Sequence, residues 1–220
     1  MADIANRRTM PSLELLQDQG ADFDEAMRIY ESAFPVDERE PRDYFIRLML
    51  EIRPEVQPLT WAIKDGAEVI GMAHLVGNRK TGALFFVYVA IRPDFRGRFS
   101  AKLLMRQIVD RSVQLCAETG IRPTGVIFEV ERIEDAKYDQ ELSFRKKRLA
   151  FFHSLGAVVL TRCYVQPALT PDRAPVPLNL MFVPFNSDWN RDELIVEMYR
   201  SVFGLDETHP YVISSISEAC

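Results

Sequence analysis

The segment from residue 84 to residue 118 constrains the fold of this chain more than any other. Apolar residues run from Leu84 to Ile91, a basic turn around Arg96 follows, and apolar side chains then recur three and four residues apart from Ser100 to Glu118. This pattern predicts a buried strand, a short turn and an amphipathic helix. Because a helix N-terminus has unpaired backbone amides and the positive end of the helix dipole, the basic turn suits a bound phosphate group. An ordinary strand-to-helix connection with solvated arginines fits the same residues.

The rest of the chain alternates between strand and helix patterns. Apolar stretches between turn signals predict strands near residues 13–16, 59–64, 68–77, 126–131, 157–165 and 178–183. Apolar side chains at helical spacing predict helices near residues 22–34, 41–49, 140–154 and 192–203. The sequence therefore predicts a mixed α/β (α+β) fold, in which the strands of residues 59–91 form a meander.

Size and charge narrow the classes of partner. With 220 residues, 47% of them hydrophobic, the chain can form one large domain or at most two small ones. Its net charge of −5 gives no electrostatic reason to expect nucleic acid, which needs clustered lysine and arginine, and mildly favours a cationic partner.

Cysteine usage and hydropathy indicate the compartment. The cysteines are odd in number and widely spaced, at Cys116, Cys163 and Cys220, so they predict neither a disulfide framework nor a metal site. No apolar run approaches the roughly 20 residues that span a bilayer, and the N-terminus lacks the apolar core of a secretion signal. We therefore expect a soluble, cytoplasmic protein that binds neither metal nor membrane.

The turn and the helix after it resemble the signature of the GNAT superfamily of acyl-CoA N-acyltransferases. That signature is arginine or glutamine, two residues, glycine, one residue, then glycine or alanine; Arg96 and Ala101 match it, whereas Phe99 stands where glycine is usual. The order of elements over residues 12–185 is similar too. The resemblance implies a mostly antiparallel central sheet flanked by helices. Residues 1–11, which precede it, read as a polar lead. Residues 186–220 would be a C-terminal helical extension packed on the same domain.

The same resemblance implies acetyl-CoA as the acyl donor. Its diphosphate would lie on the backbone amides of the turn, at Arg96, Gly97, Arg98, Phe99, Ser100, Ala101 and Lys102. A backbone N–H from the preceding strand, at Val89 or Ile91, would bind the acetyl carbonyl where charge develops. Phe99 must direct its ring elsewhere for its amide to stay accessible.

Two side chains that the resemblance implies are absent. Val87 occupies the usual position of a glutamate base, and Phe152, on the helix predicted near residues 140–154, occupies that of a tyrosine acid. Deprotonating an alkylammonium of pKa near 10.4 at neutral pH costs roughly 4 to 5 kcal/mol, so the reaction needs a base. Glu129 and Glu131 lie two apart on one strand face, and Glu129, deeper in the strand, is the favoured candidate. A solvated polar face is the alternative.

Tyr164, on the next predicted strand, is our candidate for the missing acid, although a strand tyrosine is more often a core residue. The acidic run at Asp37, Glu38 and Glu40 could attract a cationic acceptor or be a solvated loop. We predict transfer of an acetyl or short acyl group from acetyl-CoA to a primary amine of a small molecule or peptide, by direct attack in a ternary complex. The alternative is a non-catalytic GNAT-like domain that binds coenzyme A or a protein partner. An exposed closing helix or sheet edge leaves room for a homodimer.

Overall fold

A computed structural model of the chain describes residues 10–51, 53–169 and 173–219, without the side chain of Asp37. The strands in these residues are β1 (Ser12–Leu15), β2 (Val56–Asp65), β3 (Glu68–Asn78), β4 (Ala83–Ile91), β5 (Gly125–Glu131), β6 (Val158–Gln166) and β7 (Val176–Pro184). The helices are α1 (Ala21–Ala33), α2 (Arg42–Leu50), α3 (Ala101–Glu118), α4 (Asp139–Ser154), α5 (Arg191–Met198) and α6 (Pro210–Ser217). No helix among these is both long and apolar enough to cross a membrane.

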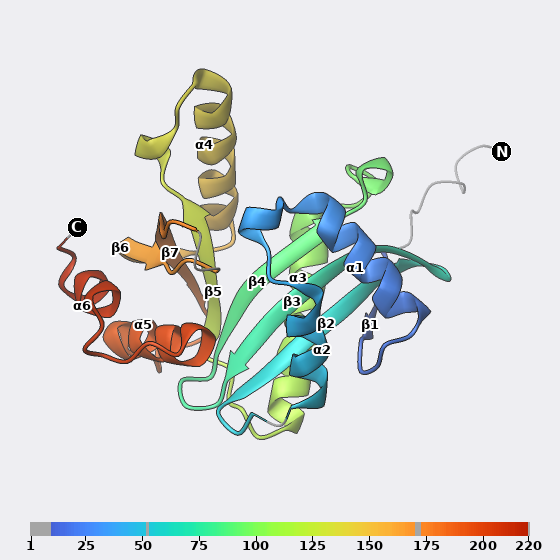
Figure 1. Ribbon diagram of the computed structural model, residues 1–220, viewed down its shortest axis with the longest axis horizontal. Helices are drawn as coiled ribbons and strands as arrows, with labels where there is room; N and C mark the ends of the chain where they lie inside the picture. Colours follow the sequence, from blue (N-terminus) through green and yellow to red (C-terminus); the bar gives the residue numbers. More distant parts are fainter. Residues whose placement is uncertain (1–9, 52, 170–172, 220) are drawn as a thin grey trace. The chain divides into compact units, whose positions relative to one another are not determined.

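The described strands form a mixed sheet in the order β1-β2-β3-β4-β5-β7-β6 (Figure 1). β4 and β5 are parallel, whereas β1 pairs with β2, and β7 with both β5 and β6, in antiparallel fashion. The fold predicted from the sequence, a mostly antiparallel sheet flanked by helices, is confirmed. The sequence did not predict α6, nor that β7 would lie between β5 and β6.

The chain divides into two compact units that are interleaved along the sequence. One comprises residues up to 52 with residues 58–74 and 88–114, and the other comprises residues 53–57, 75–87 and 115–220. β2, β3 and β4 each contribute residues to both. We call them the first and second unit and describe each by itself.

The first unit has an aromatic core between its early helices and its strands. The Tyr30 ring of α1 lies 5.0 Å from the rings of both Phe45, on α2, and Tyr88, on β4. Trp61 of β2 is buried, and its indole N–H donates to the hydroxyl of Ser112 at 3.0 Å, which fixes α3 against the strand. These contacts pack β4 at Tyr88 against the early helices and α3 at Ser112 against β2.

The second unit has its own core, made by β4 to β7 and the C-terminal helices. α5 and α6, drawn in red in Figure 1, lie beside β6 and β7. Their apolar side chains are buried against one face of the strands, in a cluster that comprises Ala83, Phe85, Ile127, Leu160, Tyr164, Leu178, Leu180, Phe182, Leu194, Ile195, Met198, Tyr199 and Val212. The residues after 185 thus complete the core of this unit.

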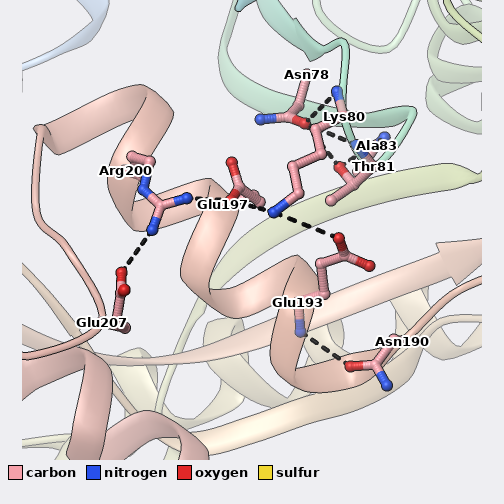
Figure 2. A network of polar contacts seen from close by, with 9 residues as sticks. All are labelled: Asn78, Lys80, Thr81, Ala83, Asn190, Glu193, Glu197, Arg200 and Glu207. Carbon is pink, nitrogen blue, oxygen red and sulfur yellow. Dashed lines mark hydrogen bonds and ion pairs between the residues drawn. The ribbon is translucent and has the colours of Figure 1, made fainter.

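An ionic network ties α5 to the turn between β3 and β4. Figure 2 shows Lys80 reaching from that turn to the carboxylates of Glu193, at 3.5 Å, and Glu197, at 2.9 Å. Arg200 pairs with Glu197 from the other side and also with Glu207. Glu197 is 5% exposed, so two cations compensate a carboxylate that has lost most of its hydration. Removing either cation would leave that charge poorly compensated.

The cysteines differ from the sequence prediction at one position. Cys116 of α3 is a free, buried thiol, and its Sγ would lie only 2.9 Å from a Cβ added at Gly77. Cys163 of β6, by contrast, is disulfide-bonded. The wide spacing of the cysteines had predicted no disulfide. That prediction is wrong at Cys163, because the spacing of cysteines along a sequence does not report their distances in the fold.

Candidate functional site

The predicted phosphate-binding turn connects β4 to α3 in the first unit. A 3₁₀ turn (Pro93–Phe95) follows β4, the chain bends at Gly97, and α3 begins at Ala101. Gly97 has φ +77°, a left-handed conformation that favours glycine, and a Cβ added there would meet no atom within 4 Å. The side of the turn at Gly97 is therefore open.

The turn leaves a series of backbone amides without partners. Within the described part of the chain, the N–H groups of Gly97, Phe99, Ser100 and Ala101 donate no hydrogen bond, whereas the Arg98 N–H donates to the Phe95 carbonyl at 3.2 Å. Free amides of this kind at a helix N-terminus favour an oxygen anion. The amide of Phe99 is among them, so the phenylalanine in place of glycine leaves its own N–H unpaired.

Two arginines add positive charge to the turn. Arg96 and Arg98 are exposed, and among the described residues neither forms an ion pair with a carboxylate. The Arg96 Nε donates to the carbonyl of Ile91 at 3.0 Å, and the Arg98 guanidinium lies 4.2 Å from the centre of the Phe95 ring. Both contacts hold the guanidinium groups at the turn, where positive charge favours a diphosphate.

The end of β4, which the resemblance assigns to the acetyl group, is shaped by a glycine on β3. A Cβ added at Gly71 would lie 2.5 Å from the Ala90 carbonyl oxygen and 2.6 Å from Cδ1 of Ile91. Only glycine allows this close approach of β3. Val89 is 37% exposed, so its surroundings are partly open. Sequence reasoning missed Gly71, whose signal was an isolated glycine inside a strand pattern.

The second unit brings the candidate base and the candidate acid into direct contact. Glu129 of β5 and Tyr164 of β6 lie on the strand face covered by the C-terminal helices, and the Tyr164 hydroxyl donates to Oε1 of Glu129. The Gln166 side-chain amide approaches Oε2 at 3.4 Å. Sequence reasoning proposed the first two residues separately and missed Gln166.

Burial raises the pKa of both groups. It raises the pKa of Glu129 to about 7, although the hydrogen bond from Tyr164 opposes the shift. Tyr164 is 0% exposed, and burial, followed by the nearby Glu129 charge, raises the pKa of its hydroxyl well above the ordinary value. Near neutral pH, Glu129 can therefore exchange a proton, whereas Tyr164 stays protonated.

Glu131 has a different environment from Glu129. Its Oε1 pairs with Arg148 of α4, and its Oε2 is buried without a partner in the described part of the chain. The two glutamates share a strand face, as their spacing predicted, but only Glu129 contacts Tyr164. The ion pair with Arg148 thus occupies one oxygen of the Glu131 carboxylate.

The positions where the family pattern has a glutamate and a tyrosine hold apolar side chains in packed surroundings. Val87 packs on the core cluster of the second unit, on the same face as Glu129. The β4–β5 ladder ends at the pair formed by Phe86 and Phe128, so Val87 and Glu129 follow the last paired residues of neighbouring strands. Phe152 of α4 lies 4.7 Å from the Phe128 ring. The carboxylate absent at Val87 thus has a counterpart one strand away.

The acidic run after α1 is partly built into the first unit. The Glu40 backbone N–H donates to the Tyr30 hydroxyl at 2.8 Å, and burial raises the pKa of the Glu40 carboxyl. Glu38 is exposed, and the side chain of Asp37 lies outside the described residues. The structure thus places one of the predicted acidic side chains at a half-buried position beside an aromatic core.

His74 of β3 is a buried residue of the same core. It is 0% exposed, its Nδ1 lies 2.9 Å from the Thr60 hydroxyl, and the Phe45 ring lies 5.2 Å away. Burial lowers its pKa to about 3, so the imidazole is neutral at physiological pH. This environment agrees with the structural role that the sequence suggested.

Residues 23–123 match the acetyltransferase (GNAT) family, a stretch that includes the whole turn but ends before β5. No curated protein sequence matches the chain. Among solved structures, an acetyltransferase of the GNAT family from Bacteroides thetaiotaomicron is 18% identical, with a TM-score of 0.58 over 84% of this chain and 93% of its own.

Two further solved structures are similar. Spermidine N-acetyltransferase from Vibrio cholerae, in complex with CoA and spermine, is 16% identical, with a TM-score of 0.52 over 78% of this chain and 95% of its own. A protein from Arabidopsis thaliana, in complex with acetyl-CoA, is 13% identical, with a TM-score of 0.53 over 80% of this chain and 99% of its own. At these identities the likeness shows the fold. The family match and the fold together confirm the predicted resemblance: residues 23–123 match the acetyltransferase (GNAT) family, and the chain has the fold of GNAT acetyltransferases.

Proposed function

We propose that this protein transfers an acetyl or similar short acyl group from acetyl-CoA to a primary amine, by direct attack in a ternary complex. The observation that carries the proposal is the set of unpaired amides at Gly97, Phe99, Ser100 and Ala101, inside the stretch that matches the family. Two of the similar structures contain CoA or acetyl-CoA. The turn of this chain suits the diphosphate that both ligands share.

The residues of the first unit would bind and orient the donor. The amides of Gly97, Phe99, Ser100 and Ala101 would hold the diphosphate, with Arg96 and Arg98 adding charge, as the resemblance implies. A backbone N–H at Val89 or Ile91 would bind the acetyl oxygen as it becomes negative. Acetyl-CoA supplies the activated thioester carbonyl.

Glu129 is our choice for the base. In the transfer, the acceptor ammonium first gives one proton to the Glu129 carboxylate, directly or through water, and the neutral nitrogen then forms a bond to the acetyl carbon. The carbon–sulfur bond breaks, and the second proton of the nitrogen goes to the departing thiolate or to solvent. A carboxyl with a pKa of about 7 is close to the most effective value for such work at neutral pH. Glu131 is less suited because Arg148 of α4 already occupies one of its carboxylate oxygens.

The contact between Tyr164 and Glu129 changes how we assign the tyrosine. Its only proton is donated to Glu129, and the ring is wholly buried, so the geometry favours a residue that orients the base. A thiol has a pKa near 8.5, so the thiolate can leave without a strong acid beside it. Direct protonation of the thiolate by Tyr164 remains a prediction from the sequence.

The proposal is tested by acetyl-CoA-dependent thiol release across a panel of polyamines, amino acids, aminoglycosides and peptide N-termini, with acetylated products identified by mass spectrometry. We expect release that depends on one amine class and disappears without the amine. The absence of an acetylated product from every class, at pH 8 and millimolar amine, would contradict the proposal.

A non-catalytic GNAT-like domain is the second candidate, and the apolar packing of Val87 and Phe152 favours it. Calorimetry with CoA separates the two. Uptake of CoA without turnover on any amine would support a binding protein, whereas turnover would exclude that candidate.

A further inference from the structure

The C-terminal layer of the second unit reaches the strand that carries Tyr164. Tyr199 follows α5 in a turn of π-helix, and its hydroxyl donates to the Val165 carbonyl at 2.9 Å and accepts from the Val165 N–H at 3.1 Å. The hydroxyl of Ser215, on α6, lies 3.1 Å from the Tyr199 hydroxyl and 3.2 Å from the Cys163 carbonyl. Two buried hydroxyls thus hold three backbone groups on either side of Tyr164.

These bonds matter because β6 is the last of the described strands in the sheet and, among them, pairs with β7 alone. Both backbone groups of Val165 bond to the Tyr199 hydroxyl, so they point away from β7, in which the register partner of Val165 is Pro177. The β6–β7 register also shifts between Thr161 and Tyr164. The strand around Tyr164 therefore depends on Tyr199 for hydrogen bonds that β7 does not provide.

We propose that Tyr199 and Ser215 are positioning residues for Glu129, because they hold β6 where the Tyr164 hydroxyl stays on the Glu129 carboxylate. The rings of Tyr164 and Tyr199 lie 5.3 Å apart, so Tyr199 supports both the backbone and the ring of its neighbour. The inference rests on the proposed function, in which Glu129 takes the acceptor proton. It gives the residues beyond 185 a role in the reaction as well as in the core.

The charged and titratable groups around Glu129 make the effect measurable. Tyr164 faces the carboxylate from β6, and Tyr199 lies near enough for Glu129 to affect its titration. Along β5 the next such group is Glu131, whose charge is compensated by Arg148 of α4. β7 presents only apolar side chains on this face. Since the hydrogen bond from Tyr164 lowers the pKa of Glu129, displacing Tyr164 should raise it.

The test compares Tyr199→Phe with Tyr211→Phe. Tyr211 lies on α6 against the same core cluster, but its hydroxyl has no hydrogen bond to β6. In the Tyr199 variant we expect the acid limb of the pH–rate profile to move up by roughly half a unit to one unit, the shift expected for one net hydrogen bond. The ¹³C chemical shift of the Glu129 carboxyl should titrate with the same displacement. The Tyr211 variant should superimpose on the wild type in both measurements.

Ser215→Ala is a second variant, which removes the Ser215 hydroxyl from the Cys163 carbonyl but leaves Tyr199 in place. We expect the acid limb of its pH–rate profile to move in the same direction by a smaller amount. Profiles that superimpose on the wild type in both the Tyr199 and the Ser215 variants, with lowered melting temperatures, would overturn the proposal and leave a structural role. If wild-type protein acetylates no amine but the Glu129 resonance still shifts in the variants, the positioning role stands and the catalytic role of Glu129 fails. The two claims are therefore separable.

Discussion

The turn before α3 and the cluster around Glu129 hold charge in opposite ways. The turn offers backbone N–H groups and two exposed arginines, so its positive charge is permanent and does not depend on any single side chain. The cluster holds a half-buried carboxylate with a pKa of about 7, so its charge changes within the physiological range. A site built from backbone can accept Phe99 in place of glycine. A site built from a side chain, by contrast, needs another side chain when the first is absent. Val87 stands where the family pattern has a glutamate, and Glu129 lies on the same face of the neighbouring strand.

The largest effect should come from the cluster. We expect Glu129→Gln to lower the rate of acetyl transfer about a hundredfold or more, because glutamine can still accept the Tyr164 hydrogen bond but cannot take a proton. Thiol release at saturating acetyl-CoA measures the loss. The matched variant Glu131→Gln, two residues along the same strand, should lose much less.

Calorimetry provides the control, because neither substitution touches the turn and both variants should bind CoA as the wild type does. Equal rates for the two variants and the wild type would mean that the base lies elsewhere.

The next effect should come from the turn. Gly97→Ala places a side chain at φ +77°, which costs roughly 1 to 2 kcal/mol of strain, and the amides that follow must shift to relieve it. We expect CoA affinity to fall about tenfold by calorimetry, equivalent to about 1.4 kcal/mol. Gly66→Ala is a matched control in the same unit, with φ +62° and no atom near the added Cβ.

Both glycine variants should lose similar thermal stability, but only Gly97→Ala should lose CoA affinity. An affinity equal to that of the control would show that the turn does not bind the diphosphate.

The smallest effect should be a pair of opposite pH slopes in stability. The pKa of Glu129 is raised in the fold to about 7, so its stabilising contribution is complete below its unfolded value of about 4.5 and is lost as pH rises to about 7. The pKa of His74 is lowered from 6.5 to about 3, so its contribution is complete above pH 6.5 and is lost as pH falls.

Melting temperatures between pH 4.5 and pH 7.5 would measure these slopes. Relative to the wild type, the melting temperature of Glu129→Gln should rise by a few degrees between pH 4.5 and pH 7.5. The melting temperature of His74→Gln should rise relative to the wild type by a similar amount as pH falls to 4.5, at about 2 to 4 °C per kcal/mol. Slopes of the same sign in both variants would contradict the two environments.

The turn was predictable because its signals are local. Gly97, the flanking arginines and the helical spacing after Ser100 all lie within one short segment. The contact between Glu129 and Tyr164 could not be predicted from the sequence, because it crosses β7 and depends on a strand order that hydropathy does not specify. Each residue was a candidate by itself. Strand periodicity indicates which face of the sheet a residue lies on, but it does not indicate which residue of another strand lies beside it.

The elements of the fold likewise differ in how strongly the local sequence specifies them. The meander and α3 arise from strong local patterns, whereas α6 was missed because its eight residues, beginning at Pro210, carry too little periodic signal. Gln166 and Gly71 were missed for related reasons: a glutamine at a strand end and a glycine in a strand acquire meaning only when the neighbouring strand is known.

The Tyr199 hydroxyl on Val165 also bears on how copies of this protein could associate. An outermost strand usually exposes N–H and C=O groups to which a second molecule can add a strand. At Val165 both groups are already occupied by a side chain of the same molecule. A homodimer that continued the sheet across β6 would have to displace that tyrosine, so self-association through this border is disfavoured.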